Sequence, residues 1–187
     1  MNKGFLFNVK HLFLNPNKTV TEYINGRRKN IFNPISFLVI AVTTYLIADA
    51  LIEVNYAGNG SNSPVNSIGQ EAGKFIKFYF KYFWVLSIIW LSFSTKLIFG
   101  KYNFAEHLAI NSFIVGQSTL IGLVSFIITK IGLLFNPLVY LSIIWMTYQI
   151  FKTKNKDVNI FFKSVRATFL FFVQLGLIAF LIGLIRS

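Results

Sequence analysis

Few side chains in this sequence could carry out chemistry, and they form no known catalytic motif. Glu106 and His107 are adjacent, and a carboxylate beside an imidazole could transfer protons. Asp49 lies inside an apolar run, where acids are costly and often functional. The structural interpretation is that Glu106 completes a capping box with Asn103 and that His107 hydrogen-bonds across a helical bundle. We favour this second interpretation and place Asp49 near a membrane interface.

The composition excludes several kinds of site. The chain has no cysteine and two histidines, which excludes disulfides, thiolate zinc sites, His-rich metal sites and a cysteine nucleophile. It also has no Gly-rich phosphate loop and no nucleophile motif. We therefore predict that the chain is not an enzyme and has no catalytic residue, no metal and no cofactor.

Hydrophobicity and charge together indicate a membrane protein. Of the 187 residues, 55% are hydrophobic, the mean hydropathy is +0.60 and the formal net charge is +12. A soluble basic protein that binds nucleic acid would not carry apolar runs of about 20 residues. We predict an all-α, polytopic helical bundle in the bacterial inner (cytoplasmic) membrane, without a nucleic-acid partner.

Five apolar runs predict five transmembrane helices in one domain that covers residues 33–187. The expected spans are 34–54, 78–99, 104–134, 137–152 and 164–185, with a flexible outer loop at 55–73 that is rich in Gly, Ser and Asn. Asn–Pro pairs at Asn33 and Asn136 predict two helix starts. The span 137–152 is the shortest, and a re-entrant hairpin formed with 104–134 is the alternative.

Residues 1–32 are a basic, amphipathic segment that precedes the bundle. Apolar residues recur at helical spacing on both sides of Asn15–Pro16, which predicts two short helices at the cytoplasmic membrane surface. The apolar face of the first helix is expected to comprise Phe5, Leu6, Val9, Leu12 and Phe13. That of the second is expected to comprise Val20, Tyr23, Ile24 and Ile31.

Basic residues predict the orientation. With five crossings, most of the 18 lysines and arginines fall on the side of the N-terminus, which the positive-inside rule places in the cytoplasm, with the C-terminus outside. With four crossings the cluster at 152–166 would face out, so the charges support the fourth span. Six basic residues are candidates for contacting anionic lipid or a cytoplasmic protein partner: Arg27, Arg28, Lys29, Lys152, Lys154 and Lys156.

Small and polar residues at helical spacing predict close helix packing, or a pore face. Helix 104–134 carries two stripes on nearly opposite faces, one of Ala105, Ala109, Ser112 and Gly116, the other of His107, Asn111, Ser118, Gly122 and Ser125. The last helix carries Gly176, Ala179 and Gly183. We place helix 104–134 at the centre of the bundle or against a neighbouring subunit, and favour packing within one chain. Asn111, Gln117 and Gln174 are expected to hydrogen-bond between helices.

Two stretches of the sequence resemble a known family. The first runs from Gly4 through Leu14-Asn-Pro-Asn-Lys and Glu22-Tyr-Ile-Asn-Gly-Arg-Arg-Lys to Phe32-Asn-Pro-Ile-Ser-Phe-Leu, and the second is Tyr102-Asn-Phe-Ala-Glu-His-Leu. They resemble an uncharacterised family of bacterial multi-pass membrane proteins, whose longer members begin with a zinc ribbon that this cysteine-free chain lacks. The resemblance implies an architecture and no activity. A weaker similarity, of type only, is to small membrane accessory proteins of type VI CRISPR systems.

The sequence therefore predicts a non-enzymatic integral membrane protein that acts as an oligomerising accessory or scaffold, as a homo-oligomer with a basic cytoplasmic face. One alternative is a membrane pore or regulator accessory to an RNA-guided antiviral defence system. Another is a small-solute transporter, which requires Asp49, Glu106 and His107 to line one cavity.

Overall fold

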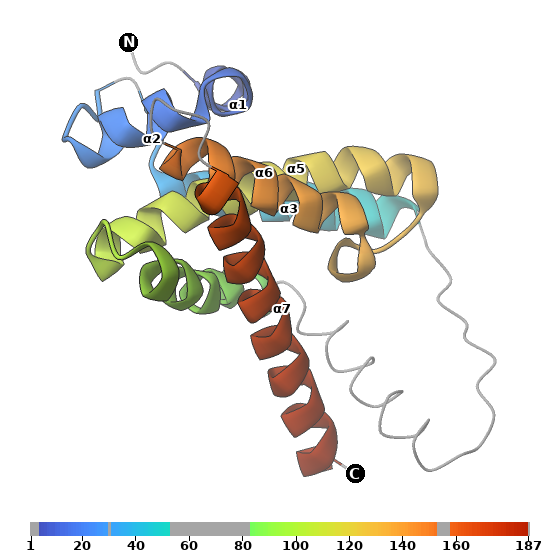
Figure 1. Ribbon diagram of the computed structural model, residues 1–187. Helices are drawn as coiled ribbons and strands as arrows, with labels where there is room; N and C mark the ends of the chain where they lie inside the picture. Colours follow the sequence, from blue (N-terminus) through green and yellow to red (C-terminus); the bar gives the residue numbers. More distant parts are fainter. Residues whose placement is uncertain (1–3, 30, 53–82, 153–157, 187) are drawn as a thin grey trace.

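The computed structural model describes residues 4–29, 31–52, 83–152 and 158–186, and within these ranges the chain is all-α, without a β-strand (Figure 1). The helices are α1 (Phe5–Leu14), α2 (Pro16–Ile24), α3 (Pro34–Ile52), a helix over Phe83–Phe99, α5 (Phe104–Thr129), the 3-10 turn η1 (Leu133–Phe135), α6 (Pro137–Phe151) and α7 (Val158–Arg186). The all-α fold predicted from the sequence is confirmed. The predicted loop at 55–73 lies outside the described residues.

An asparagine side chain caps the N-terminus of three of the helices, as the sequence predicts. Asn33 accepts a hydrogen bond from the amide of Ile35 at 3.0 Å, and Asn136 accepts one from Leu138 at 3.1 Å. Before α5, Asn103 and Glu106 form a reciprocal capping box with two bonds of 2.8 Å. These caps satisfy amides that have no partner inside the first turn of a helix, so the chain starts each helix at a defined residue.

Two predicted helix bounds are wrong. We expected the helix that begins at 104 to continue to 134, but α5 ends at Thr129 because Lys130 adopts a left-handed conformation (φ 59°) and its amide caps Phe126. This turn lets the chain fold back into η1 and α6. The last helix begins at Val158 rather than 164, because its first turns pack on α6, where the rings of Phe161 and Tyr148 are 6.1 Å apart.

Three of the described helices are long and apolar enough to cross a membrane: Pro34–Ile52, Phe104–Thr129 and Val158–Ile178. Among the described residues, the helices Phe83–Phe99 and Pro137–Phe151 are also apolar but shorter. At about 1.5 Å per residue, the 15 residues of α6 extend about 22 Å, less than the roughly 30 Å of a bilayer core. The described part of the chain thus contains three candidate spans by length and composition, where the sequence predicts five.

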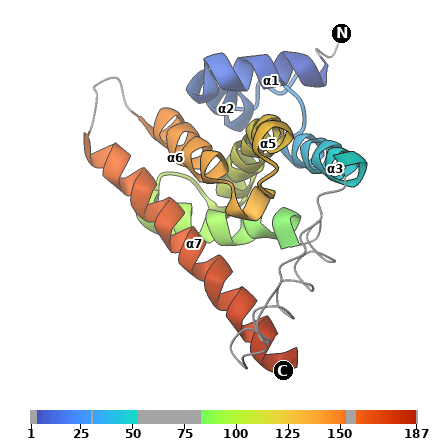
Figure 2. The same cartoon turned by 90° about the vertical axis from the view of Figure 1, so that its right-hand side faces the viewer.

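Helix α5 occupies the centre of the bundle. In Figure 2 it is seen end-on, with α1 and α2 above it, α3 and α6 on either side and the helix Phe83–Phe99 below. The most apolar stretch of α5 is 61% buried, against 28% for α3 and 33% for α7. This central position is one of the two that we predicted for the helix.

The ring contacts along α5 define the direction of its neighbours. Phe37 and Tyr45 of α3 lie 5.8 Å and 5.3 Å from Phe113 and Phe126, so α3 runs parallel to α5. At the other end of α5, the ring of Phe151 from α6 lies 5.6 Å from His107, so α6 runs antiparallel. Because α3 begins near Phe113, the first turns of α5 extend beyond it.

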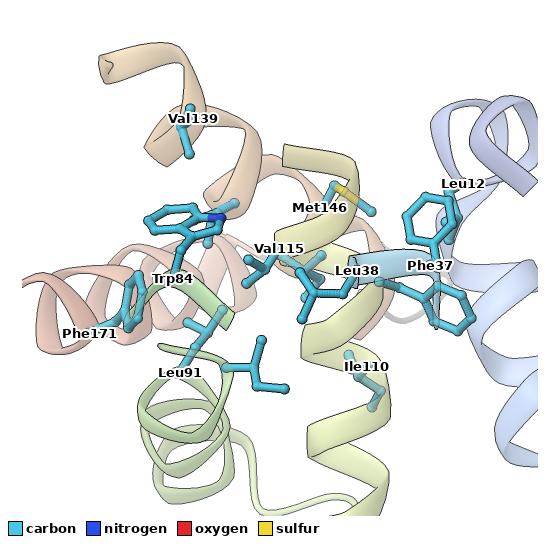
Figure 3. Close-up of a cluster of buried hydrophobic side chains, with 14 of the residues drawn as sticks. Leu12, Phe37, Leu38, Trp84, Leu91, Ile110, Val115, Val139, Met146 and Phe171 are labelled. Atoms are coloured by element: carbon cyan, nitrogen blue, oxygen red, sulfur yellow. The ribbon is translucent and has the colours of Figure 1, made fainter. Parts of the chain in front are cut away.

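The hairpin of α1 and α2 lies across the side of α5. Gln117 donates to the carbonyl of Val9 at 3.4 Å, and the ring of Tyr23 meets Phe113 edge-on at 5.6 Å. Leu12 is fully buried and joins the same core cluster as the bundle. In Figure 3, Val115 of α5 lies between Leu38 of α3 and Trp84 of the helix Phe83–Phe99. One hydrophobic core therefore includes the N-terminal hairpin.

Candidate functional site

The first stripe of α5 packs against α3 within the chain. A Cβ on Gly116 would lie 2.8 Å from the ring of Phe37 and 3.2 Å from the backbone of Leu38. Ser112 is buried and donates to the carbonyl of Leu108 at 2.8 Å. Ala105 is exposed and Ala109 is half-buried, because α3 does not reach that end of α5. Gly116 therefore permits close approach of two helices of one chain.

The second stripe faces the helix Phe83–Phe99 through a buried polar cluster. Nδ1 of His107 lies 3.0 Å from the hydroxyl of Thr95. The amide nitrogen of Asn111 donates to the same hydroxyl at 2.8 Å and to that of Ser92 at 3.2 Å. All four side chains are fully buried. We call Ser92, Thr95, His107 and Asn111 the Thr95 cluster; it fixes the spacing of two helices by hydrogen bonds.

Further along α5, apolar packing interrupts the polar stripe. Trp84 donates to Thr119 at 2.9 Å, but one turn later a Cβ on Gly122 would lie 2.5 Å from both Leu133 and Val139. Beyond this contact, Ser125 donates to Asn136 at 3.3 Å. The stripe is thus divided into two polar regions by close contact of α5 with η1 and α6.

The three residues proposed for a transport site do not line one cavity. Glu106 accepts from the amide of Asn103, while His107 contacts Thr95. Asp49 follows Tyr45 by one turn on α3, and Tyr45 packs on Phe126 near the opposite end of α5. The 20 residues from Glu106 to Phe126 extend about 30 Å along a helix. The described geometry therefore contradicts a site that joins Asp49 to Glu106 and His107.

Cationic side chains from separate segments gather at one end of the bundle. Asn17 of α2 donates to the carbonyls of Ile150 at 2.6 Å and Lys152 at 3.5 Å, which brings the start of α2 to the end of α6. Phe151 stacks on Phe99 at 4.1 Å and lies 6.0 Å from Tyr102, which adds the turn before α5. The cations on these segments are all exposed, and we call them the basic end: Lys18, Lys96, Lys101 and Lys152.

The other basic candidates lie elsewhere or outside the described residues. Arg27, Arg28 and Lys29 are exposed in the connection from α2 to α3, and the guanidinium of Arg28 lies 5.1 Å from the ring centre of Tyr23. Lys154 and Lys156 fall outside the described residues. Within the described ranges, no three His, Asp or Glu side chains come together as metal ligands.

On α7, two candidate residues differ in their surroundings. Gln174 accepts a bond of 3.0 Å from the buried Ser94, which links α7 to the helix Phe83–Phe99. Gly176 is exposed, and a Cβ there would meet no described atom within 4 Å. The side chain of Ala179 and the environment of Gly183 lie outside the description. Asn111, Gln117 and Gln174 each make a bond to another helix, as the sequence suggests.

The apolar face predicted for α1 is divided between the core and the surface. Leu12 is fully buried, whereas Leu6 and Phe13 are 78% and 54% exposed. Asn8 is buried instead, and its side chain accepts from the amide of Phe32 at 3.1 Å. No local signal marks this bond, since its partner is 24 residues away.

The hydroxyls of the Thr95 cluster were also missed. Here a signal exists: Ser92 and Thr95 are three residues apart on an apolar helix, so they share a face. Polar residues that repeat along one face of an apolar helix indicate a neighbouring helix.

The comparisons with known proteins reach only the N-terminal part of the chain. A family described as a protein of unknown function (DUF3667) matches residues 2–46, which comprise α1, α2 and most of α3. No curated protein and no solved structure matches the chain. The chain is thus similar, over its N-terminal hairpin and first long helix, to an uncharacterised family.

Proposed function

We propose that this chain is a non-enzymatic integral protein of the bacterial inner membrane that holds anionic lipid at the basic end and serves there as a scaffold for a cytoplasmic protein partner. The observation that carries the proposal is the convergence of Lys18, Lys96, Lys101 and Lys152 from three separate parts of the chain. Each cation near an anionic membrane surface contributes about 1 kcal/mol. The four cations together therefore strongly favour binding of the basic end to an anionic membrane surface.

The proposal includes five crossings, with the N-terminus in the cytoplasm and the C-terminus outside. Its support is that Lys101 and Lys152 lie at one end of the bundle while Lys130 follows the opposite end of α5. α6 crosses if the bilayer thins or flanking side chains reach the interface.

Because the chain has no cysteine, single cysteines test this topology directly. A membrane-impermeant maleimide added outside intact cells should label Lys130→Cys and leave Lys101→Cys and Lys152→Cys unlabelled until the membrane is opened. Labelling of Lys101→Cys from outside would overturn the orientation.

The lipid proposal is tested by native mass spectrometry of the purified protein with phosphatidylglycerol. Replacing Lys18, Lys96, Lys101 and Lys152 by Gln should remove most bound lipid, since a loss of about 1 kcal/mol per charge weakens binding roughly fivefold each time. The matched control is Lys130→Gln, a single exposed cation at the other end. Equal lipid retention in the fourfold variant and the wild type would contradict the proposal.

The proposed homo-oligomer is tested on α7. Gly116 and Gly122 are poor positions for this test, because both contact other helices of the same chain. Gly176 is better, since a side chain there meets no described atom. We expect Gly176→Leu to lower the mass of the assembly measured in lipid nanodiscs while thermal stability is retained. An unchanged mass would show that the α7 face around Gly176 is not part of the subunit interface.

The antiviral accessory and the pore stay as alternatives that no observation in the described residues favours. Leu133 and Val139 of the same chain pack against Gly122 and interrupt the polar stripe of α5, which therefore does not form a continuous polar face. Gene neighbourhood tests the accessory role: a gene far from any guide-RNA array would contradict it.

A further inference from the structure

Six buried polar atoms lack hydrogen-bond partners among the described residues, five on α5 and α6 and one at the cap of α6: Nε2 of His107, Oδ1 of Asn111, Oε1 of Gln117, the hydroxyl of Ser118, the hydroxyl of Thr147 and Nδ2 of Asn136. Their side chains are at most 2% exposed. A buried polar group without a partner is destabilising, and native proteins nearly always satisfy such groups with protein or ordered water. Several in one region indicate a ligand that supplies the missing bonds.

Helix register indicates that three of these atoms face one site. His107 and Asn111 both bond the hydroxyl of Thr95, at 3.0 Å and 2.8 Å, so their free atoms belong to side chains that meet at one point. Phe151 of α6 stacks on the ring of His107, and α6 runs antiparallel to α5. Thr147, one turn before Phe151, therefore lies at the level of Asn111, one turn after His107.

The hydrogen-bond polarity of the site favours a neutral molecule that both donates and accepts. The hydroxyl of Thr95 accepts from Asn111 and has a single hydrogen of its own. We assign this hydrogen to Nδ1 of His107, whose contact with the hydroxyl (3.0 Å) is shorter than that of the carbonyl of Ser92 (3.3 Å). Nε2 then carries the ring hydrogen and is a free donor, while Oδ1 of Asn111 is a free acceptor.

Aromatic rings cover the site toward the basic end. Phe151 lies 5.6 Å from the ring of His107, Tyr102 lies 6.1 Å from it, and Phe99 stacks on Phe151 at 4.1 Å. His107 and Asn111 are consequently 0% exposed. A bound molecule must be small, and it would exchange with solvent only when these rings move.

We propose that the Thr95 cluster and Thr147 form a binding site for internal water, in which water accepts from Nε2 of His107 and donates to Oδ1 of Asn111, with Thr147 completing its bonds. Water has the required size, neutrality and combination of donor and acceptor. The site lies beneath the basic end and is separate from its exposed cations.

The direct test is solid-state NMR of the full chain in lipid bilayers, with ¹⁵N-labelled histidine. The variant His11→Gln leaves His107 as the single histidine. We expect the shift of a hydrogen-bearing Nε2, with magnetisation transferred to it from water. An unprotonated Nε2, or a protonated Nε2 that receives no transfer from water, would overturn the proposal.

A stability measurement gives an independent test. If the hydroxyl of Thr147 binds water, Thr147→Val removes a hydrogen bond and should lower the thermal midpoint by about 2–4 °C in a chain of this length. If the hydroxyl is unpaired and dry, the same change removes an unsatisfied group and should raise the midpoint. Thr168→Val on α7 is the matched control for the loss of one hydrogen bond and should also lower the midpoint, because its buried hydroxyl donates to the carbonyl of Ser164 at 3.0 Å. A Thr147→Val midpoint at or above that of the wild type would refute the water site.

Discussion

Gly122 offers a stringent test of how α5, η1 and α6 pack. A Cβ at this position would lie 2.5 Å from a methyl of Leu133 and 2.5 Å from a methyl of Val139. Both neighbours are in the core, at 1% and 0% exposure, so neither can turn toward solvent to make room. The substitution Gly122→Ala must therefore displace a helix or force a side chain away from its preferred rotamer.

The expected change in the free energy of unfolding on Gly122→Ala follows from two opposing effects. Alanine in a helix interior is favoured over glycine by about 0.8–1 kcal/mol. Adding atoms to a well-packed core costs typically about 1–3 kcal/mol. The control Gly176→Ala, measured on the detergent-solubilised monomer, has the first effect alone, because no described atom of the chain lies within 4 Å of its Cβ. We expect the two variants to differ in free energy of unfolding by the packing cost, about 1–3 kcal/mol.

The assay measures the thermal midpoint of unfolding in one detergent. The readout is the fraction of protein that remains monodisperse after heating. A difference of 1 kcal/mol corresponds to about 2–4 °C for a chain of this length. Gly176→Ala should be at or above the wild type, and Gly122→Ala clearly below Gly176→Ala. Equal midpoints for the two alanine variants would show that the contact at Gly122 is loose, which would refute the reasoning.

Three further predictions concern single polar contacts. Asn103→Ala removes the cap of α5 and should cost about 0.5–2 kcal/mol in thermal stability, whereas Glu106→Gln should cost less because glutamine also serves in a capping box. Gln174→Leu breaks the link from α7 to the helix Phe83–Phe99 and leaves a buried serine hydroxyl with one fewer bond; a loss of about 1 kcal/mol is expected by chemical denaturation, and a gain would contradict the assignment. Asn17→Ala releases α2 from the carbonyls that end α6, so amide hydrogen exchange in α1 and α2 should accelerate while that in α5 stays constant. Uniform exchange across all helices would contradict it.

Local chemistry made the helix starts predictable. Asn33, Asn103 and Asn136 each precede a residue pattern whose capping bonds form within three residues, so no distant partner is needed. The central position of α5 was also predictable, because small and polar residues on two faces of an apolar helix require protein on both. Its contacts with α3 and with the helix Phe83–Phe99 meet that requirement.

What the sequence could not supply is pairing over long distances. The burial of Asn8 depends on the amide of Phe32, and the exposure of Leu6 and Phe13 follows from how the hairpin lies across α5. The end of α5 at Lys130 was missed because a lysine in the left-handed conformation has no sequence signature of the kind glycine provides. Apolar runs also predicted a span at 137–152, where α6 has 15 residues and is shorter than a bilayer core requires, whereas residues 78–82 of the predicted span 78–99 lie outside the described residues.

The bond from Asn17 to Ile150 has a consequence for how the protein is made. These residues are 133 positions apart, so the N-terminal hairpin is synthesised long before α6, to which it is tied. At about 5–20 residues per second, translation of the intervening chain takes about 7–27 s. Until then, the faces of α1 and α2 that later join the core have no complete docking surface. Closure of the hairpin onto α6 is therefore a late step in biogenesis.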